Sequence, residues 1–115
     1  MDLSLTTREV RGVLVMDMSG RLSVLDQNFR QAVLLFLKAG HRHFVLKMTD
    51  LSYIDSSGLG QLVSVYTSLS NVGGSVQLLA PSSRVRELLD ITKLDTVFDI
   101  IEDETRIAKS GSNVA

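Results

Sequence analysis

The sequence predicts an α/β domain in which a four- to five-stranded, mixed but mostly parallel sheet is packed by about four helices. Short apolar runs typical of strands alternate along the chain with longer segments in which apolar residues recur every three or four positions. A helix between two strands makes those strands parallel, because a crossover of that length is not a hairpin turn. The 115 residues suffice for one domain with its own core.

The chain opens with two strands that form a hairpin. Residues 2–9 alternate loosely between apolar and polar side chains, which predicts an edge strand. Arg11–Gly12 predicts a tight turn, and the run that begins at Val13 is apolar on both faces up to Asp17, as in a strand that is covered on both sides. We expect Gly20 to end this second strand.

The segment from Leu25 to Lys38 has the period of an amphipathic helix. Ser23 or Asp26 is placed to cap its start, and Gly40 stands where a helix commonly stops. The apolar residues at helical spacing are Leu25, Phe29, Ala32, Val33, Phe36 and Leu37.

A buried strand is expected from His43 to Met48, parallel to the second strand. The segment from Ser57 to Asn71 predicts a second amphipathic helix, which Val72–Gly74 closes. The apolar positions of this helix are Leu59, Leu62, Val63, Tyr66 and Leu69.

The rest of the chain continues the same alternation. We expect a single domain over residues 1–109 and a flexible tail over 110–115, because the last residues are mostly small and polar. The remaining elements are a strand at 75–80 that Pro81 cuts, a helix from Ser82 or Ser83, a connection at 91–94, a strand at 97–101 and one or two helical turns within 102–109.

Composition and charge exclude several classes of function. The formal net charge is −1 and no cluster of Lys and Arg stands out, which argues against nucleic acid as the main partner. The absence of cysteine excludes disulfides, thiolate catalysis and cysteine metal sites. No apolar run reaches the roughly 18 residues of a membrane span, and no signal peptide is visible, so we expect a cytoplasmic protein without membrane insertion.

The strongest functional signal lies in residues 51–60. A short apolar approach leads to Asp55, Ser56 and Ser57, whose side-chain oxygens suit the start of a helix, where backbone N–H groups lack intrahelical partners. The aligned peptide dipoles give a helix N-terminus a positive charge of about half a unit. A phosphate on Ser56 would therefore be tolerated without unfolding the chain.

The segment from Asp55 to Gly60 (DSSGLG) resembles the central motif of bacterial anti-sigma factor antagonists, the single-domain members of the STAS family. The resemblance covers nearly the whole chain. Gly20 stands at the turn before the first helix, Gly73–Gly74 follow the second helix, and residues 85–94 resemble the third helix and its loop. The resemblance implies the STAS fold.

In that family, the unphosphorylated antagonist binds a serine kinase that is also the anti-sigma factor, which frees the sigma factor. The resemblance implies that this kinase phosphorylates Ser56, with Ser57 as second choice, and that a metal-dependent serine phosphatase reverses the step. The chain would then be a regulatory binding module, without enzymatic activity, cofactor or metal. The implied partner-binding residues are Asp55, Ser56, Ser57, Gly58, Leu59, Ser23 and Leu88, with Ser23 standing where the family often has an acidic residue.

Structural roles are the alternative for most of these residues. Asp55 and Ser56 can act only as a helix cap. Gly58 and Gly60 can let a partner approach closely or let the helix pack tightly on the sheet. The same choice between interface and core applies to Leu59, which its place in the first helical turn slightly favours for the interface, and to Leu88.

Three other functions are alternatives to partner binding through Ser56. A STAS domain can serve as a structural subunit of a transporter or lipid-transport complex, which the serine at position 23 favours. His41 and His43 have no evident third ligand for a metal. Ser56 is a poor hydrolase nucleophile, because no G-x-S-x-G elbow surrounds it and no histidine is evidently placed as its base.

Overall fold

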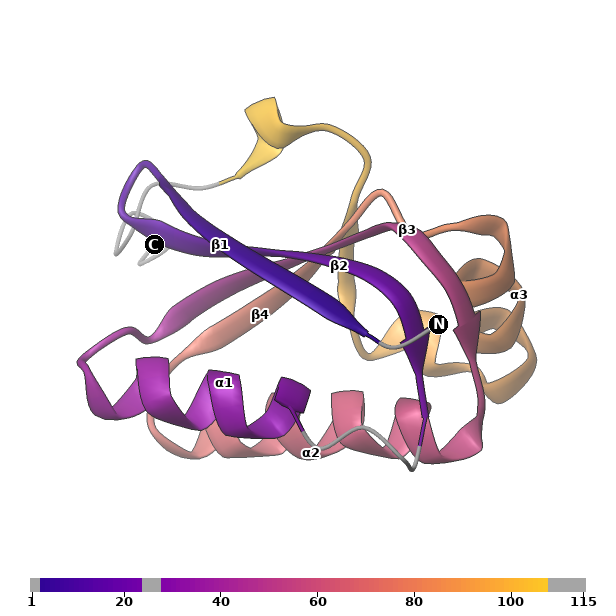
Figure 1. Ribbon diagram of the computed structural model, residues 1–115, viewed down its shortest axis with the longest axis horizontal. Helices are drawn as coiled ribbons and strands as arrows, with labels where there is room; N and C mark the ends of the chain where they lie inside the picture. Colours follow the sequence, from indigo (N-terminus) through magenta and orange to yellow (C-terminus); the bar gives the residue numbers. More distant parts are fainter. Residues whose placement is uncertain (1–2, 24–27, 108–115) are drawn as a thin grey trace.

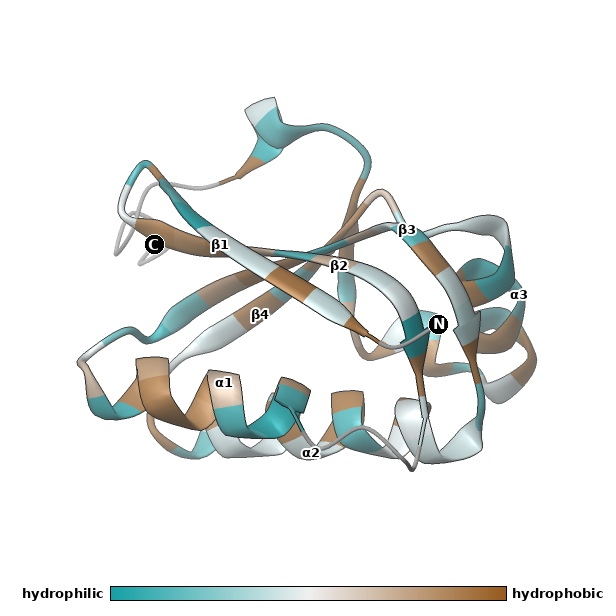
Figure 2. Ribbon diagram, in the orientation of Figure 1, coloured by the Kyte–Doolittle hydropathy of each residue, from teal (hydrophilic) through white to brown (hydrophobic). Residues whose placement is uncertain are grey.

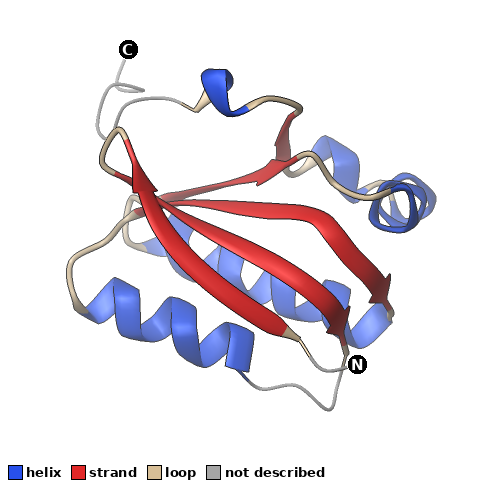
Figure 3. Cartoon of the chain, turned by 45° about the horizontal axis from the view of Figure 1, so that its top comes forward, coloured by secondary structure: helices blue, strands red, loops and turns tan. Residues whose placement is uncertain are grey.

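The computed structural model describes residues 3–23 and 28–107. Its elements are β1 (Ser4–Val10), β2 (Val13–Leu22), α1 (Asn28–Lys38), β3 (His43–Ile54), α2 (Ser56–Asn71), β4 (Ser75–Leu79), α3 (Ser83–Thr92) and β5 (Asp99–Ile101), with 3₁₀ turns at Leu94–Thr96 and Glu104–Arg106. The strands form one sheet in the order β1-β2-β3-β4-β5. Helices α1 and α2 cover one face of the sheet, and α3 lies to one side, next to β3 (Figures 1 and 3).

The predicted α/β architecture is confirmed. β1 pairs antiparallel with β2 as a hairpin, and every later pairing in the sheet is parallel. The fourth helical segment, expected within residues 102–109, is a single 3₁₀ turn, so the described part of the chain has three α-helices. The expected start of the first helix at Leu25 and the expected tail at 110–115 lie outside the described residues.

The two central strands run further than the sequence predicts. β2 does not end at Gly20 but continues to Leu22, and β3 continues past Met48 to Ile54. The last residues of the two strands pair with each other, with Leu22 opposite Ile54, and two register shifts accommodate the irregular steps between them. This pairing satisfies backbone groups that would otherwise need water or side chains, so the polar residues here remain in the sheet.

The last strand, β5, is shorter than the expected 97–101, because the residues just before Asp99 pack in the core or form a turn. Phe98 is buried and meets Tyr66 of α2 edge-on, with ring centroids 5.5 Å apart. Ahead of it, Lys93 adopts a left-handed conformation and Leu94–Thr96 form a 3₁₀ turn. The chain therefore reaches the edge of β4 only at Asp99.

Both faces of the central strands are buried, but by different means. The face toward α1 and α2 carries the large core, in which Met16, Leu46 and Phe29 are fully buried. Figure 2 shows hydrophobic residues recurring along β2, β3 and β4. A smaller cluster fills the opposite face and consists of Val13, Val15, Val45, Leu79 and Ile107.

That second face is closed by the segment that follows β5. Ile107 is 1% exposed, and the Arg11 guanidinium holds its segment by donating to the main-chain oxygens of Thr105, at 3.3 Å, and of Ile107, at 2.9 Å. Arg8 forms an ion pair with Glu104 of the same segment. The β1–β2 hairpin thereby anchors this cover over the sheet.

Two glycines of α2 have different surroundings. A β-carbon on Gly58 would collide with the main-chain oxygen of Leu22 and lie 3.0 Å from a side-chain carbon of Ile54. A β-carbon on Gly60 would meet nothing within 4 Å. The sequence left open whether these glycines allow a partner to approach or let the helix pack on the sheet. Gly58 lets the helix pack on the sheet, whereas the packing does not require a glycine at position 60.

We predict effects of opposite sign for alanine at these two positions. Gly58→Ala should lower the free energy of unfolding by about 1–3 kcal/mol, because main chain blocks the added carbon. Gly60→Ala should leave it unchanged or raise it by up to about 1 kcal/mol, because alanine favours the helix over glycine. Urea unfolding followed by circular dichroism measures both, and equal effects of the two variants would contradict this account of the packing.

Candidate functional site

The DSSGLG segment forms the junction between the end of β3 and the start of α2. Asp55 has an extended backbone and is the N-cap of α2, with its Oδ1 atom accepting from the Gly58 N–H at 3.0 Å. The helix then begins at Ser56. The predicted capping chemistry is therefore present, and the cap also binds the Ser57 hydroxyl.

The Asp55 carboxylate collects three hydrogen bonds. Ser57 Oγ donates to Oδ1 at 2.6 Å, the Gly58 N–H donates to the same oxygen, and the Tyr53 hydroxyl donates to Oδ2 at 3.3 Å. These donors favour the ionised form and hold the pKa of Asp55 below its ordinary value, with the Ser57 hydroxyl as the largest cause and the Gly58 N–H next. The turn therefore carries a fixed negative charge at neutral pH.

Ser56 and Ser57 differ in availability. Ser57 is half-buried, and its proton is used in the bond to Asp55. Ser56 is exposed, and its hydroxyl makes no hydrogen bond to any residue in the described ranges 3–23 and 28–107. Ser56 is thus the hydroxyl that a second protein can reach at this helix start.

The other implied partner-binding residues lie at different depths. Ser23 is half-buried, and its main-chain oxygen accepts from Gln61 Nε2 of α2 at 2.9 Å. Leu88 of α3 is half-buried and packs against the large core. Asp26, the alternative cap to Ser23, lies outside the described residues.

Leu59 differs from the expectation that its side chain faces a partner. It is 5% exposed and belongs to the large core, as its helical spacing with Leu62 equally allowed. Gly58 is also buried, against the main chain of Leu22. Neither Gly58 nor Leu59 is therefore part of the accessible surface around Ser56.

The structure adds an arginine that sequence reasoning missed. Arg21, near the end of β2, pairs in register with Tyr53 of β3, and its guanidinium carbon lies 4.0 Å from the centroid of the Tyr53 ring. Since the Tyr53 hydroxyl donates to Asp55, this cation is connected to the candidate site. The sequence did not predict this contact, because the expected strands ended at Gly20 and Met48 and so did not include Arg21 and Tyr53.

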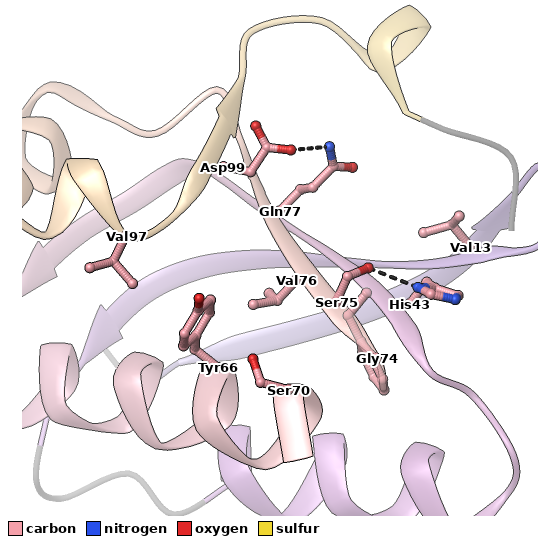
Figure 4. A pocket seen from close by; sticks show the side chains of 11 residues that line it. Val13, His43, Tyr66, Ser70, Gly74, Ser75, Val76, Gln77, Val97 and Asp99 are labelled. Atoms are coloured by element: carbon pink, nitrogen blue, oxygen red, sulfur yellow. Dashed lines mark hydrogen bonds between the residues drawn. The ribbon is translucent and has the colours of Figure 1, made fainter. Parts of the chain in front are cut away.

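A hollow of about 330 Å³ lies elsewhere in the molecule, between the second half of α2 and the first residues of β3, β4 and β5 (Figure 4). Its polar side chains largely satisfy one another: His43 Nδ1 lies 2.8 Å from Ser75 Oγ, and Gln77 Nε2 donates to Asp99 at 2.7 Å. Ser56 follows the opposite end of β3, so this hollow is separate from the candidate site.

Within residues 3–23 and 28–107, no group of three His, Cys, Asp or Glu side chains is arranged to hold a metal ion. None of the helices in these ranges is long and apolar enough to cross a membrane.

Relatives of known sequence are similar to this chain over half of its length or more. A relative from Paenibacillus polymyxa, named an anti-sigma F factor antagonist, is 29% identical over 90% of this chain and 91% of its own length. A candidate anti-sigma factor antagonist from Thermotoga neapolitana is 39% identical over 58% of this chain. The match spans 59% of the length of that relative, and the same share of a second Thermotoga relative.

Solved structures of anti-sigma factor antagonists have the same fold as this chain. The crystal structure of a candidate anti-sigma factor antagonist from Thermotoga maritima superposes with a TM-score of 0.82 at 27% identity, over 88% of each chain. The phosphorylated form of the Bacillus cell fate determinant SpoIIAA has the same fold, with a TM-score of 0.70 at 21% identity, over 89% of this chain and 94% of that one. The family model of the STAS domain matches residues 4–107, nearly all of the sequence. This chain is a member of the STAS domain family.

Proposed function

We propose that this protein is an anti-sigma factor antagonist, a regulatory binding module that acts without catalysis of its own. In its unphosphorylated form it binds an anti-sigma serine kinase, and phosphorylation of Ser56 releases it. The observation that carries the proposal is the exposed, unbonded hydroxyl of Ser56 at the N-terminus of α2, next to a Ser57 whose proton is engaged. The names of the relatives support the class of partner.

The switch works through charge at the contact. A phosphate on Ser56 adds about −1.5 to −2 charges at neutral pH, on a helix start whose dipole favours an anion. The fold can therefore accept the group. A docked partner cannot, because the phosphate adds bulk and a charge that must lose its water where a small hydroxyl had fitted. The neighbouring Asp55 carboxylate adds to the local negative charge.

The bound and released forms would control transcription by mass action. While the antagonist occupies the kinase, the kinase does not hold its sigma factor, and transcription that depends on this sigma factor proceeds. Phosphorylation ends that state, and a metal-dependent serine phosphatase restores it. The expected location of such a protein is the cytoplasm.

A second candidate is a STAS subunit of a transporter or lipid-transport complex that uses the Ser56 surface for contact only. The serine at position 23 favours it, because its half-buried main chain is bonded to Gln61 and the position supplies no acidic group. Co-purification distinguishes the two: recovery with a transport ATPase and membrane proteins supports the transport subunit, and recovery with a serine kinase supports the antagonist.

We predict that the serine kinase encoded nearest to this protein, given ATP, transfers phosphate to Ser56. Mass spectrometry should locate the phosphate on Ser56 in the wild type and in the Ser57→Ala control. Ser56→Ala should accept none and remain bound. Ser56→Asp should bind about tenfold more weakly, or roughly 1.4 kcal/mol. Absence of both phosphate on Ser56 and binding of the unmodified protein would remove the proposal.

We also predict a pH-dependent role for the Asp55 cap, which keeps Ser57 engaged. Because the pKa of Asp55 is lowered in the folded state, its contribution to stability is full above the ordinary carboxyl pKa of about 4 and is lost as pH falls through the folded value. Asp55→Ala should lower the free energy of unfolding by about 1 kcal/mol at pH 7.

The matched control is Ser82→Ala, which removes the hydroxyl cap of α3, a group that does not titrate in this range. Denaturant unfolding between pH 7 and pH 2.5 should show the Asp55→Ala penalty shrinking and the Ser82→Ala penalty staying constant. A penalty at Asp55 that is the same at both pH values would show that the ionised carboxylate is not what stabilises this turn.

A further inference from the structure

Arg21 is an exposed cation beside the turn at Asp55–Ser57. Its guanidinium carbon lies 4.0 Å from the centroid of the Tyr53 ring, within the range of a cation–π contact. The two residues are register partners near the ends of β2 and β3. Tyr53 continues the connection, because its hydroxyl donates to Asp55 Oδ2. The position of the cation relative to the start of α2 is therefore set by strand pairing and by one aromatic ring.

We propose that Arg21 is a specificity residue for the kinase partner and receives a carboxylate of that partner. The inference rests on the proposed function and names the chemistry of the surface that meets this turn. The partner would present an acidic side chain opposite Arg21 when it docks over Ser56.

The contact with Tyr53 does not use the N–H donors of Arg21 as hydrogen-bond donors. It draws on the charge of the guanidinium over the ring, and the planar fork of N–H groups can still bind both oxygens of a carboxylate. Among the described residues, Arg21 forms no ion pair; the ion pairs there are Arg8–Asp17, Arg8–Glu104, Arg84–Glu87 and Arg86–Glu102. No ion pair within residues 3–23 and 28–107 therefore occupies these donors, and they can bind a carboxylate of a partner.

The two charged side chains connected at this turn, Arg21 and Asp55, differ in what they can still offer a partner. Asp55 is the acidic residue connected to this cation through Tyr53, and its two oxygens already accept from Ser57, Gly58 and Tyr53. The exposed neighbours Ser52 and Ser56 are neutral. Between these two, Arg21 has donors that no ion pair of the described residues occupies, whereas the Asp55 oxygens are engaged within the turn. Arg and Tyr are also the residue types that are enriched at interface contacts.

The test measures binding of the nucleotide-free serine kinase encoded nearest to this protein, by titration calorimetry at 50 mM and 500 mM NaCl. Arg21→Gln should weaken binding about tenfold at the lower salt and Arg21→Glu about a hundredfold, because the second change places like charges together. Both ratios should shrink at the higher salt, since salt screens exposed charges. Tyr53→Leu, which removes the ring, should weaken binding as well.

The control is Lys38→Gln, which makes the same change of charge on an exposed side chain at the last turn of α1. It should bind like the wild type at both salt concentrations. Unfolding midpoints of all variants, measured alongside, verify that the Arg21 side chain is not needed for the fold.

The outcomes separate this inference from the proposed function. If the wild type binds and both Arg21 variants bind equally well, the inference is overturned and the proposed function stands. If the Arg21 variants weaken binding only when ATP is bound to the kinase, the cation meets a nucleotide phosphate. The inference that it receives a carboxylate is then overturned. If the wild type itself does not bind, the proposed function fails and the inference falls with it.

Discussion

The direct contact between α2 and the main chain at the ends of β2 and β3 determines the rest of the site. Because Gly58 has no side chain, the first turn of the helix can lie against the main-chain oxygen of Leu22. That contact sets where the helix begins, and the Asp55 cap sets how it begins. The two together leave Ser56 facing solvent and place Ser57 against the carboxylate.

Sequence reasoning succeeded where the physics is local. The cap at Asp55 and the exposure of the helix start follow from residue types that are adjacent in the chain, and the alternation of elements follows from the period of the apolar residues. The first hairpin was predicted for the same reason, since a two-residue turn at Arg11–Gly12 joins two strands directly.

It failed where distant segments decide. Nothing local distinguishes Gly58 from Gly60, because the difference comes from the main chain of Leu22. The place of Leu59 in the first helical turn slightly favoured it for the interface, and the orientation of α2 on the sheet instead places it in the core. The stack of Arg21 on Tyr53 depends on the register of two parallel strands joined through a helix, and that register includes shifts that no period in the sequence reveals.

The cover over the second face of the sheet has a consequence for local unfolding. The helices close the first face with many buried side chains, whereas Ile107 and the arginine contacts of its segment close the other. This cover is the part expected to open at the lowest free energy, since it buries little apolar surface and holds few backbone hydrogen bonds. Its opening would admit water to Val13, Val15 and Val45 without moving α2, so the turn at Asp55–Ser57 stays intact when this cover opens.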